Sequence, residues 1–284
     1  MKRRFEAPRR PPVVTPPISR VVTSLTNPLI KDIRALEMRK VRQEAGLFVV
    51  EGLKLVADAI ENGWPIRILV HRSGEDKPML ARAITATTRG GGEVLEVTGE
   101  ILEKLSRRDN PQTVIGVFEQ RLERLADVEL NGEALWVGLD RVRDPGNLGT
   151  IIRTADAVGA EGVMLIGETT DPFGLEATRA TMGSIFNVRL AAGSAAEFLA
   201  WRKTFTGRIT GTHLSGTHDY RDIDYGGPNL LLMGNEQQGL PDDLAEACDA
   251  LVKIPMRGQA DSLNLAVATG VMLFEMARKQ LKLG

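Results

Sequence analysis

The fold class is decided by residues 230–241, which read Leu-Leu-Leu-Met-Gly-Asn-Glu-Gln-Gln-Gly-Leu-Pro. The four leading apolar residues do not alternate with polar ones, which is typical of a strand in a parallel sheet covered by helices on both faces. Gly234 follows, where a ligand can approach the backbone without meeting a Cβ atom. Pro241 then begins a helix with acids in its first turn. The stretch therefore predicts an α/β sheet with a ligand loop at the carboxyl end of a strand.

A second segment of the same kind lies upstream. The apolar run 134–139 predicts another buried strand, and Pro145 with Gly146 predicts the sharp turn after it. Asn147 is expected to cap the helix that follows, and Arg153 lies inside that helix. The spacing Gly-x-Gly-x-x-Gly is missing here, so a dinucleotide-dependent dehydrogenase on an α/β sheet is a remote alternative.

Residues 252–268 form a third segment of this kind. It predicts a strand, a polar loop, and a final helix over 263–281 that Ser262 caps and whose first turn holds Asn264. Asn264 is polar among apolar neighbours, and burying an unpaired amide costs about 1–3 kcal/mol, so core packing alone does not explain it. The segment also offers an apolar slot suited to an adenine ring, formed by Ile254, Met256, Leu263 and Leu265.

The first part of the chain predicts a separate layered α/β domain. Strand-like runs such as 47–50 and 114–118 alternate with helix-like stretches such as 29–42. Residues 121–133 are polar and charged, as expected of a linker. The expected organisation is a disordered, basic, proline-rich arm (1–20), a first domain (21–120), the linker (121–133) and a second domain (134–284).

The charge of the chain is unevenly distributed. The formal net charge is −1, yet residues 1–45 hold 11 Lys and Arg against 4 Asp and Glu. A basic end on a mildly acidic body suits a polyanionic partner, with a solvated tail as the alternative. The prolines of the arm oppose the amphipathic helix of a mitochondrial presequence, so a cytoplasmic bacterial protein is favoured.

Cysteine and histidine are scarce. Cys248 is the single cysteine and the three histidines are His71, His213 and His218, which excludes an internal disulfide and a Cys/His zinc cluster. We expect a cytoplasmic enzyme without a metal. Apolar runs of the roughly 18 residues that a membrane span needs are absent from the sequence.

With these segments in view, the chain resembles the SpoU (TrmH) family of RNA 2′-O-methyltransferases, part of the SPOUT superfamily. The family's three motifs are matched in order by Asn147-x5-Arg153, by Gly234-Asn235-Glu236-x2-Gly239-Leu240, and by Ile254-Pro255-Met256 followed by Ser262-Leu263-Asn264. Segments 27–31, 48–52 and 111–114 resemble the family's substrate-binding domain, a ribosomal-protein-like α/β sandwich.

The resemblance implies a second domain with a deep trefoil knot, binding of S-adenosyl-L-methionine in the knotted loops, and a homodimer with its active site close to the subunit interface. The implied catalytic residues are Asn147, Arg153, Glu236, Ser262 and Asn264. The implied cofactor contacts are Leu232, Gly234, Ile254, Met256, Leu263 and Thr212.

The implied reaction is methyl transfer to a ribose 2′-hydroxyl in structured RNA, with 23S-type ribosomal RNA favoured. A transfer RNA methyltransferase and a catalytically silent RNA-binding assembly protein are the alternatives, although a silent protein need not keep the motif residues. Basic side chains of the first helix and of a nearby loop are the expected RNA contacts, with a solvated helix face as the alternative: Lys31, Arg34, Arg39, Lys40, Arg42, Arg107 and Arg108.

Overall fold

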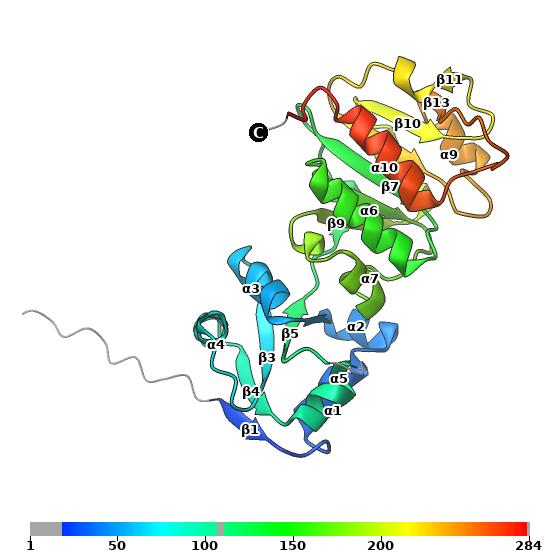
Figure 1. The fold of residues 1–284 in the computed structure, drawn as a ribbon. Helices are drawn as coiled ribbons and strands as arrows, with labels where there is room; N and C mark the ends of the chain where they lie inside the picture. The colour runs from blue at the N-terminus through cyan, green and yellow to red at the C-terminus, as the bar shows by residue number, and fades with distance from the viewer. Residues whose placement is uncertain (1–18, 107–110, 283–284) are drawn as a thin grey trace, which may run out of the picture.

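The computed structural model describes residues 19–106 and 111–282, and within these ranges it contains two sheets. Figure 1 shows an elongated molecule with one sheet toward each end and a junction near α2 and α7. The expected basic arm and the candidate RNA contacts Arg107 and Arg108 fall mainly or wholly outside the described residues.

The N-terminal sheet has the strand order β1-β4-β3-β5-β2, and β5 runs antiparallel to both of its neighbours. One face packs against α1 and α5, and the other face packs against α3 and α4. The sheet is therefore the middle layer of an α/β sandwich. Its strands are Arg20–Val22 (β1), Leu47–Glu51 (β2), Ile66–Arg72 (β3), Glu93–Val97 (β4) and Val114–Glu119 (β5), and the helices are Pro28–Ala35 (α1), Arg39–Ala45 (α2), Leu53–Glu61 (α3), Pro78–Arg89 (α4) and Gly99–Ser106 (α5).

The helix predicted over 29–42 is two helices, because the chain breaks between α1 and α2. The Arg42 guanidinium donates to the carbonyl oxygens of Leu36 (2.7 Å) and Glu37 (2.6 Å) at this break. Carbonyls at a helix end lack helical partners, so a buried cation stabilises the interruption. Helical spacing in the sequence could not show this contact between the two helices.

The C-terminal sheet has the order β11-β13-β10-β12-β7-β8-β9-β6, and all of its described strand pairs are parallel. This confirms the parallel α/β sheet predicted from residues 230–241. Its strands are Glu123–Arg124 (β6), Leu135–Asp140 (β7), Gly162–Ile166 (β8), Arg189–Gly193 (β9), Arg208–Thr212 (β10), His218–Asp219 (β11), Asn229–Met233 (β12) and Ala250–Lys253 (β13), and the helices are Pro145–Ala157 (α6), Leu175–Ala180 (α7), Ala195–Arg202 (α8), Asp242–Glu246 (α9) and Leu265–Met276 (α10).

The two faces of this sheet carry different layers. Along β12, Leu231 and Met233 pack with residues of α6 and α10, whereas Leu230 and Leu232 pack with residues of α8 and α9. Successive side chains of a strand point to opposite faces, so a strand with helices on both sides is apolar throughout.

Residues 121–133, expected as a linker, pack against the C-terminal sheet. Strand β6 pairs in parallel with β9, and Leu125, Val128 and Leu130 are buried beside α8. The Trp201 indole nitrogen donates to the carbonyl of Val128 at 2.9 Å. The charged residues of this stretch lie toward the surface, as does Leu122 at 45% exposure, while Leu125, Val128 and Leu130 add to the core. Composition alone therefore hides its role.

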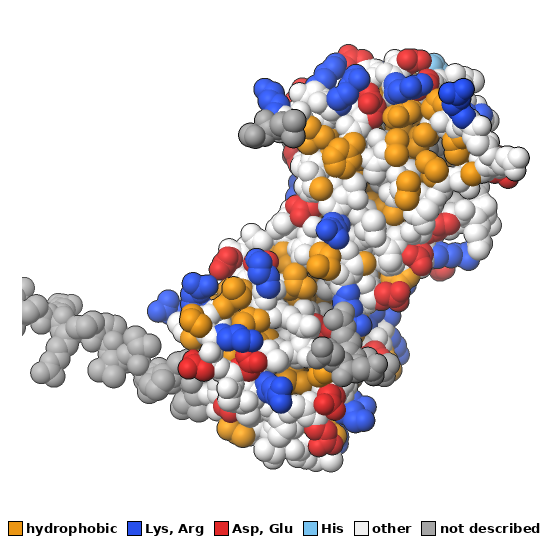
Figure 2. Space-filling view, viewed as in Figure 1, with side chains coloured by type: hydrophobic (Ala, Val, Ile, Leu, Met, Phe, Trp, Pro, Cys, Tyr) orange, Lys and Arg blue, Asp and Glu red, His pale blue; other side chains and the backbone are white. Residues whose placement is uncertain are grey.

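The last helix, α10, leaves apolar side chains uncovered. Val267 is 54% exposed and Phe274 is 52% exposed, with the half-buried Val271 between them. Figure 2 shows hydrophobic side chains gathered over this part of the C-terminal domain. Residues spaced by three and four lie on one face of a helix, so these side chains form a stripe, here called the α10 stripe.

The two domains share a continuous apolar core. The Phe48 ring lies 4.9 Å from Phe173, and Trp64 lies 5.2 Å from Phe186, measured between ring centroids. The Trp64 indole nitrogen also donates to the Phe186 carbonyl at 3.1 Å. Aromatic packing of this kind holds the sheets together through the segment that follows β8.

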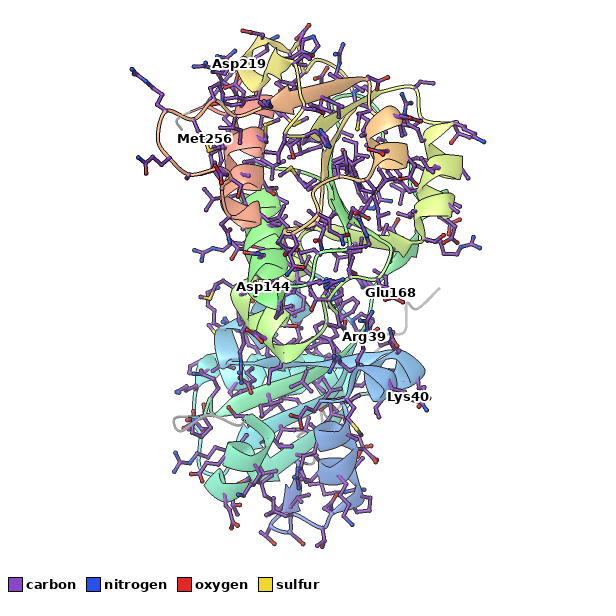
Figure 3. The ribbon with its side chains drawn as sticks, turned by 90° about the vertical axis from the view of Figure 1, so that its right-hand side faces the viewer. Arg39, Lys40, Asp144, Glu168, Asp219 and Met256 are labelled. Atoms are coloured by element: carbon purple, nitrogen blue, oxygen red, sulfur yellow. The ribbon has the colours of Figure 1, made fainter. Side chains whose placement is uncertain are left out.

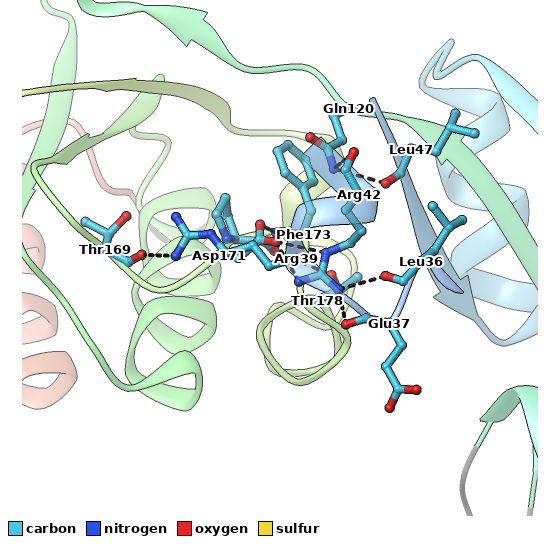
Figure 4. Close-up of polar contacts among 11 residues, drawn as sticks. Leu36, Glu37, Arg39, Arg42, Leu47, Gln120, Thr169, Asp171, Phe173 and Thr178 are labelled. Atoms are coloured by element: carbon cyan, nitrogen blue, oxygen red, sulfur yellow. Dashed lines mark hydrogen bonds and ion pairs between the residues drawn. The ribbon is translucent and has the colours of Figure 1, made fainter. Parts of the chain in front are cut away.

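A buried ion pair lies beside this aromatic core. Arg42 is 6% exposed, and its Nη2 atom lies 2.6 Å from Oδ2 of Asp171. Figure 3 places Arg39 at the junction, whereas Lys40 points away from it. The close-up in Figure 4 shows Arg42 bonded to Asp171 and to two carbonyls, with Arg39 bonded to the Thr169 carbonyl at 2.9 Å.

Candidate active site

The three motif loops leave the C-terminal sheet at one edge. Strand β12 lies between β7 and β10, and β13 lies on the other side of β10. Because these strands are parallel, the loops that follow β7, β12 and β13 emerge together at their carboxyl ends. This topology brings residues separated by more than a hundred positions into one site.

A chain of hydrogen bonds joins the three loops. Asn147 donates through Nδ2 to Oε1 of Glu236 at 3.3 Å, and its own Oδ1 atom accepts from Nδ2 of Asn264 at 3.0 Å. One amide therefore connects the carboxylate of the second motif to the amide of the third. The structure brings three of the five predicted catalytic residues into direct contact.

The helix caps differ from those predicted. Asp144, rather than Asn147, caps α6, because its Oδ1 atom accepts from the Asn147 backbone nitrogen at 2.6 Å. Asn264, rather than Ser262, caps α10, because its Oδ1 atom accepts from the backbone nitrogens of Ala266 and Val267. A carboxylate at a helix N-terminus is favourable, and in α6 it leaves the Asn147 side chain available for the site.

Asn264 is exposed, so the cost of burying an amide does not apply to it. Its Oδ1 atom caps the helix while its Nδ2 atom reaches Asn147. Ser262 is exposed two residues earlier in the loop, and none of the described residues forms a side-chain hydrogen bond with it.

Arg153 lies on the exposed side of α6. Among residues 19–106 and 111–282, its guanidinium has neither a hydrogen-bond partner nor an ion-pair partner, whereas Arg141, just after β7, is paired with Asp140. A guanidinium that is not engaged within the chain has its five donors available for an anion.

The loops beyond the strands expose large apolar side chains. Leu214 is 74% exposed after β10, Met256 is 42% exposed after β13, and Leu263 is 38% exposed before α10. Ile254 is half-buried at the start of the same loop. Apolar surface flanked by backbone amides and carbonyls is what an adenosyl group requires, so these residues fit such a ligand.

Two predicted cofactor contacts and one slot residue have other partners. The Leu232 and Leu265 side chains belong to the core, at 0% and 8% exposure, and so cannot line the loop surface. The Thr212 hydroxyl, partly exposed, donates to the sulfur of Met233 at 3.4 Å. Leu232 was placed by its position in the motif, but strand alternation directs it to the α8 and α9 face.

Gly234 is required by the backbone of its own loop. A Cβ atom there would lie 2.2 Å from the carbonyl carbon of Gly239 and from the nitrogen of Leu240. Asn235 and Gly239 form an isolated bridge that closes the loop. The predicted reason, close approach of a ligand, is therefore not needed to explain this glycine.

Asn235 is a site residue that the sequence analysis did not single out. It is 6% exposed, it donates to the Arg141 carbonyl at 2.8 Å, and its Oδ1 atom accepts from the backbone nitrogen of Gln237 at 2.9 Å. Asparagine side chains commonly hold turns by bonding backbone two residues on. Its position between Gly234 and Glu236 was the available signal.

The predicted RNA contacts divide into three groups. Arg42 is wrong as an RNA contact, because its guanidinium is buried against Asp171 and two carbonyls. Arg39 is exposed but donates to Thr169. The exposed cations of α1 and α2 that stay available are Lys31, Arg34 and Lys40, of which Lys40 lies 3.8 Å from Glu44 in a solvated pair.

Metal-binding clusters and membrane-spanning helices are both absent from the described residues. In ranges 19–106 and 111–282, His, Cys, Asp and Glu side chains do not gather in groups of three or more that could hold a metal ion. No helix in those ranges is both long and apolar enough to cross a bilayer.

Comparison with known proteins matches both parts of the chain. Residues 134–274 match the SpoU rRNA Methylase family, and residues 27–116 match the MRM3-like substrate binding domain. A 23S rRNA (uridine(2479)-2′-O)-methyltransferase from Streptomyces viridochromogenes is 32% identical over 93% of this chain and 94% of its own length. The 23S rRNA (guanosine(2553)-2′-O)-methyltransferase RlmP of Bacillus subtilis is 28% identical over 90% of this chain and 98% of its own.

Solved structures agree with this assignment. An AdoMet-bound rRNA methyltransferase from Sinorhizobium meliloti is 52% identical, covers 93% of this chain and 99% of its own, and superposes with a TM-score of 0.89. The predicted family and the two-domain α/β fold are thereby confirmed. Since sequence and fold match along nearly the whole chain, this protein belongs to the SpoU rRNA methylase family.

Proposed function

We propose that this protein is a cytoplasmic enzyme that transfers a methyl group from S-adenosyl-L-methionine to a ribose 2′-hydroxyl of 23S-type ribosomal RNA. The observation that carries the proposal is the hydrogen-bonded series Glu236–Asn147–Asn264 across three loops. The relatives named above act on 23S rRNA by name, and one related structure holds the donor.

The donor would lie against the loops that follow β10, β12 and β13. Met256, Leu263 and Ile254 would contact its adenine ring, and the backbone of the loop after Gly234 would read its polar edges. When bound, the donor supplies a methyl carbon that is already activated by its sulfonium charge. The chain must then orient the ribose and stabilise the charge that develops on the attacking oxygen.

Arg153 is the residue we propose for that stabilisation. The 2′-hydroxyl loses its proton to solvent water as its oxygen attacks, and a guanidinium is a poor proton acceptor because it stays protonated at neutral pH. The guanidinium would instead grip the adjacent phosphate and stabilise the nascent alkoxide. Asn147 and Glu236 would hold the loops around the ribose.

Arg153→Lys tests this role, since lysine keeps the charge but lacks the planar fork. We expect kcat to fall at least about tenfold, which corresponds to about 1.4 kcal/mol of transition-state stabilisation. Near-full activity of this variant across pH 6 to 9 would show that the planar guanidinium is not needed for catalysis. The exposed Arg278, which follows α10 and forms an ion pair with Glu275 at 3.5 Å, provides a matched control through Arg278→Lys.

The whole proposal is tested by two measurements. Calorimetric titration should show binding of S-adenosyl-L-methionine and none of NAD. Mapping of 2′-O-methyl groups over all cellular RNAs, with and without the gene, should show one lost position in 23S rRNA. If the lost methyl group lies in a transfer RNA, the substrate is transfer RNA and not 23S rRNA. If the protein does not bind the donor, it is an RNA-binding protein and not a methyltransferase.

We also propose that the enzyme is a homodimer formed through the α10 stripe. Val267, Val271 and Phe274 present apolar side chains to solvent beside the exposed face of α6 that carries Arg153. Exposed apolar surface on a folded protein commonly marks an interface. Pairing of two stripes would bring Arg153 of each subunit close to the subunit boundary.

A further inference from the structure

Arg141 lies at the carboxyl end of β7 and pairs with a buried carboxylate. Its Nε and Nη2 atoms lie 2.9 Å and 2.8 Å from Oδ2 of Asp140, whose side chain is 2% exposed. A buried carboxylate is tolerated only when it is paired, so Asp140 depends on this guanidinium.

The same guanidinium reaches across to the loop after β12. Its Nη1 atom donates to Oε1 of Gln238 at 3.1 Å. The Arg141 carbonyl accepts from Nδ2 of Asn235 at 2.8 Å. One residue thus bonds two positions of the loop that carries Glu236, once through its backbone and once through its side chain.

The backbone of Arg141 adopts a conformation that residues other than glycine rarely adopt. Its φ angle is +46°, and its Cγ atom packs close to Gly167, where an added Cβ would lie 3.1 Å away. Such conformations persist where the surrounding contacts determine them, and they gather at functional sites. A glycine would fit the backbone here but could not make the side-chain contacts.

We propose that Arg141 is a positioning residue that fixes the loop 234–239, so that Glu236 meets Asn147 and the donor-binding backbone is preformed. The inference rests on the proposed donor site and adds a residue outside its three motifs. Asp140 anchors the guanidinium, and the guanidinium in turn anchors Gln238. Pre-ordering of this loop lowers the cost of ordering it when a ligand binds.

Gln238→Ala is the direct test, because it removes the tether and leaves the Asp140 pair intact. We expect donor affinity to fall about three- to tenfold and kcat to fall with it, while the KM for RNA stays constant. Asn131→Ala is the control, since that exposed amide side chain lies outside the loop and has no side-chain hydrogen bond with any of the described residues. Equal donor affinity in Gln238→Ala and wild type would overturn the inference.

The double variant Asp140→Asn/Arg141→Gln separates positioning from charge pairing. It removes the buried carboxylate together with its partner, so the melting temperature should recover relative to Arg141→Gln alone. Donor affinity should stay low if the tether matters. Recovery of both the melting temperature and the donor affinity in the double variant would mean that Arg141 serves only to neutralise Asp140. Failure of the wild type to bind the donor would instead refute the proposed function.

Discussion

At the scale of single residues, Asn147 connects the three loops of the site. It accepts from Asn264 and donates to Glu236 with the two ends of one amide. An amide can fill both roles, whereas a carboxylate can only accept. Asp144 makes this possible, because it takes over the capping of α6.

Asn147→Asp should therefore disable the enzyme at neutral pH. The new carboxylate would face Glu236, and loss of a hydrogen bond to a charged group costs about 1.5–3 kcal/mol, so kcat/KM should fall about 10- to 100-fold. The exposed Asn131→Asp serves as control. A deficit no larger than that of Asn147→Ala, which removes the amide without adding a charge, would contradict the charge argument.

The sequence predicted much of this site and missed the parts that depend on tertiary contacts. The resemblance to the SpoU family implied Asn147, Glu236 and Asn264 as catalytic residues, and the structure brings them together. Arg42 was predicted as an RNA contact because helix spacing gives no sign of a partner 129 residues away. The cap at Asp144 was missed because Asn147 is an equally good capping residue by type.

At the scale of elements, α1 and α2 present the cations that can meet RNA. Replacing Lys31, Arg34 and Lys40 with alanine should weaken RNA binding and flatten its salt dependence, because each phosphate contact adds about 0.7–0.9 to the slope of log K against log salt. Arg42 is left intact to preserve the fold. Filter binding between 50 and 300 mM salt measures the slope, and an unchanged slope would exclude these helices from the interface.

The α10 stripe leads to a separate prediction. Phe274→Glu and Val267→Glu should each shift the protein toward monomer in sedimentation equilibrium, since a charge in an apolar interface loses its hydration. Val21→Glu, at another exposed apolar position on β1, is the control. A dimer that survives both α10 variants would place the subunit interface elsewhere.

The elements themselves were mostly predictable, and their connections were not. The strands β7, β8 and β12 coincide with apolar runs of the sequence, because burial on both faces leaves a continuous signal. Residues 123–130 give no such signal, since a short edge strand with charged neighbours resembles a linker. The trefoil knot, which follows from the resemblance alone, stays a prediction.

At the scale of the whole molecule, the junction between the domains should make them unfold together. Arg42→Ala would leave Asp171 buried without its cation, a change that typically costs about 3–5 kcal/mol. We expect a lower midpoint in guanidinium unfolding for Arg42→Ala. In the wild type, the transitions followed by tryptophan fluorescence and by circular dichroism should coincide. Lys40→Ala is the exposed control. A midpoint for Arg42→Ala equal to wild type would mean that the ion pair contributes nothing.

The shared aromatic core restricts how such enzymes can be recombined. Phe48, Trp64 and Phe118 of the first domain rest on Phe173 and Phe186, which belong to the stretch after β8. A chimera that joins the N-terminal domain of a related enzyme to this C-terminal domain would also have to take the stretch after β8 from that related enzyme. A fusion point between β5 and β6 would separate these aromatic side chains from their partners. The apolar surface exposed on both parts would favour aggregation.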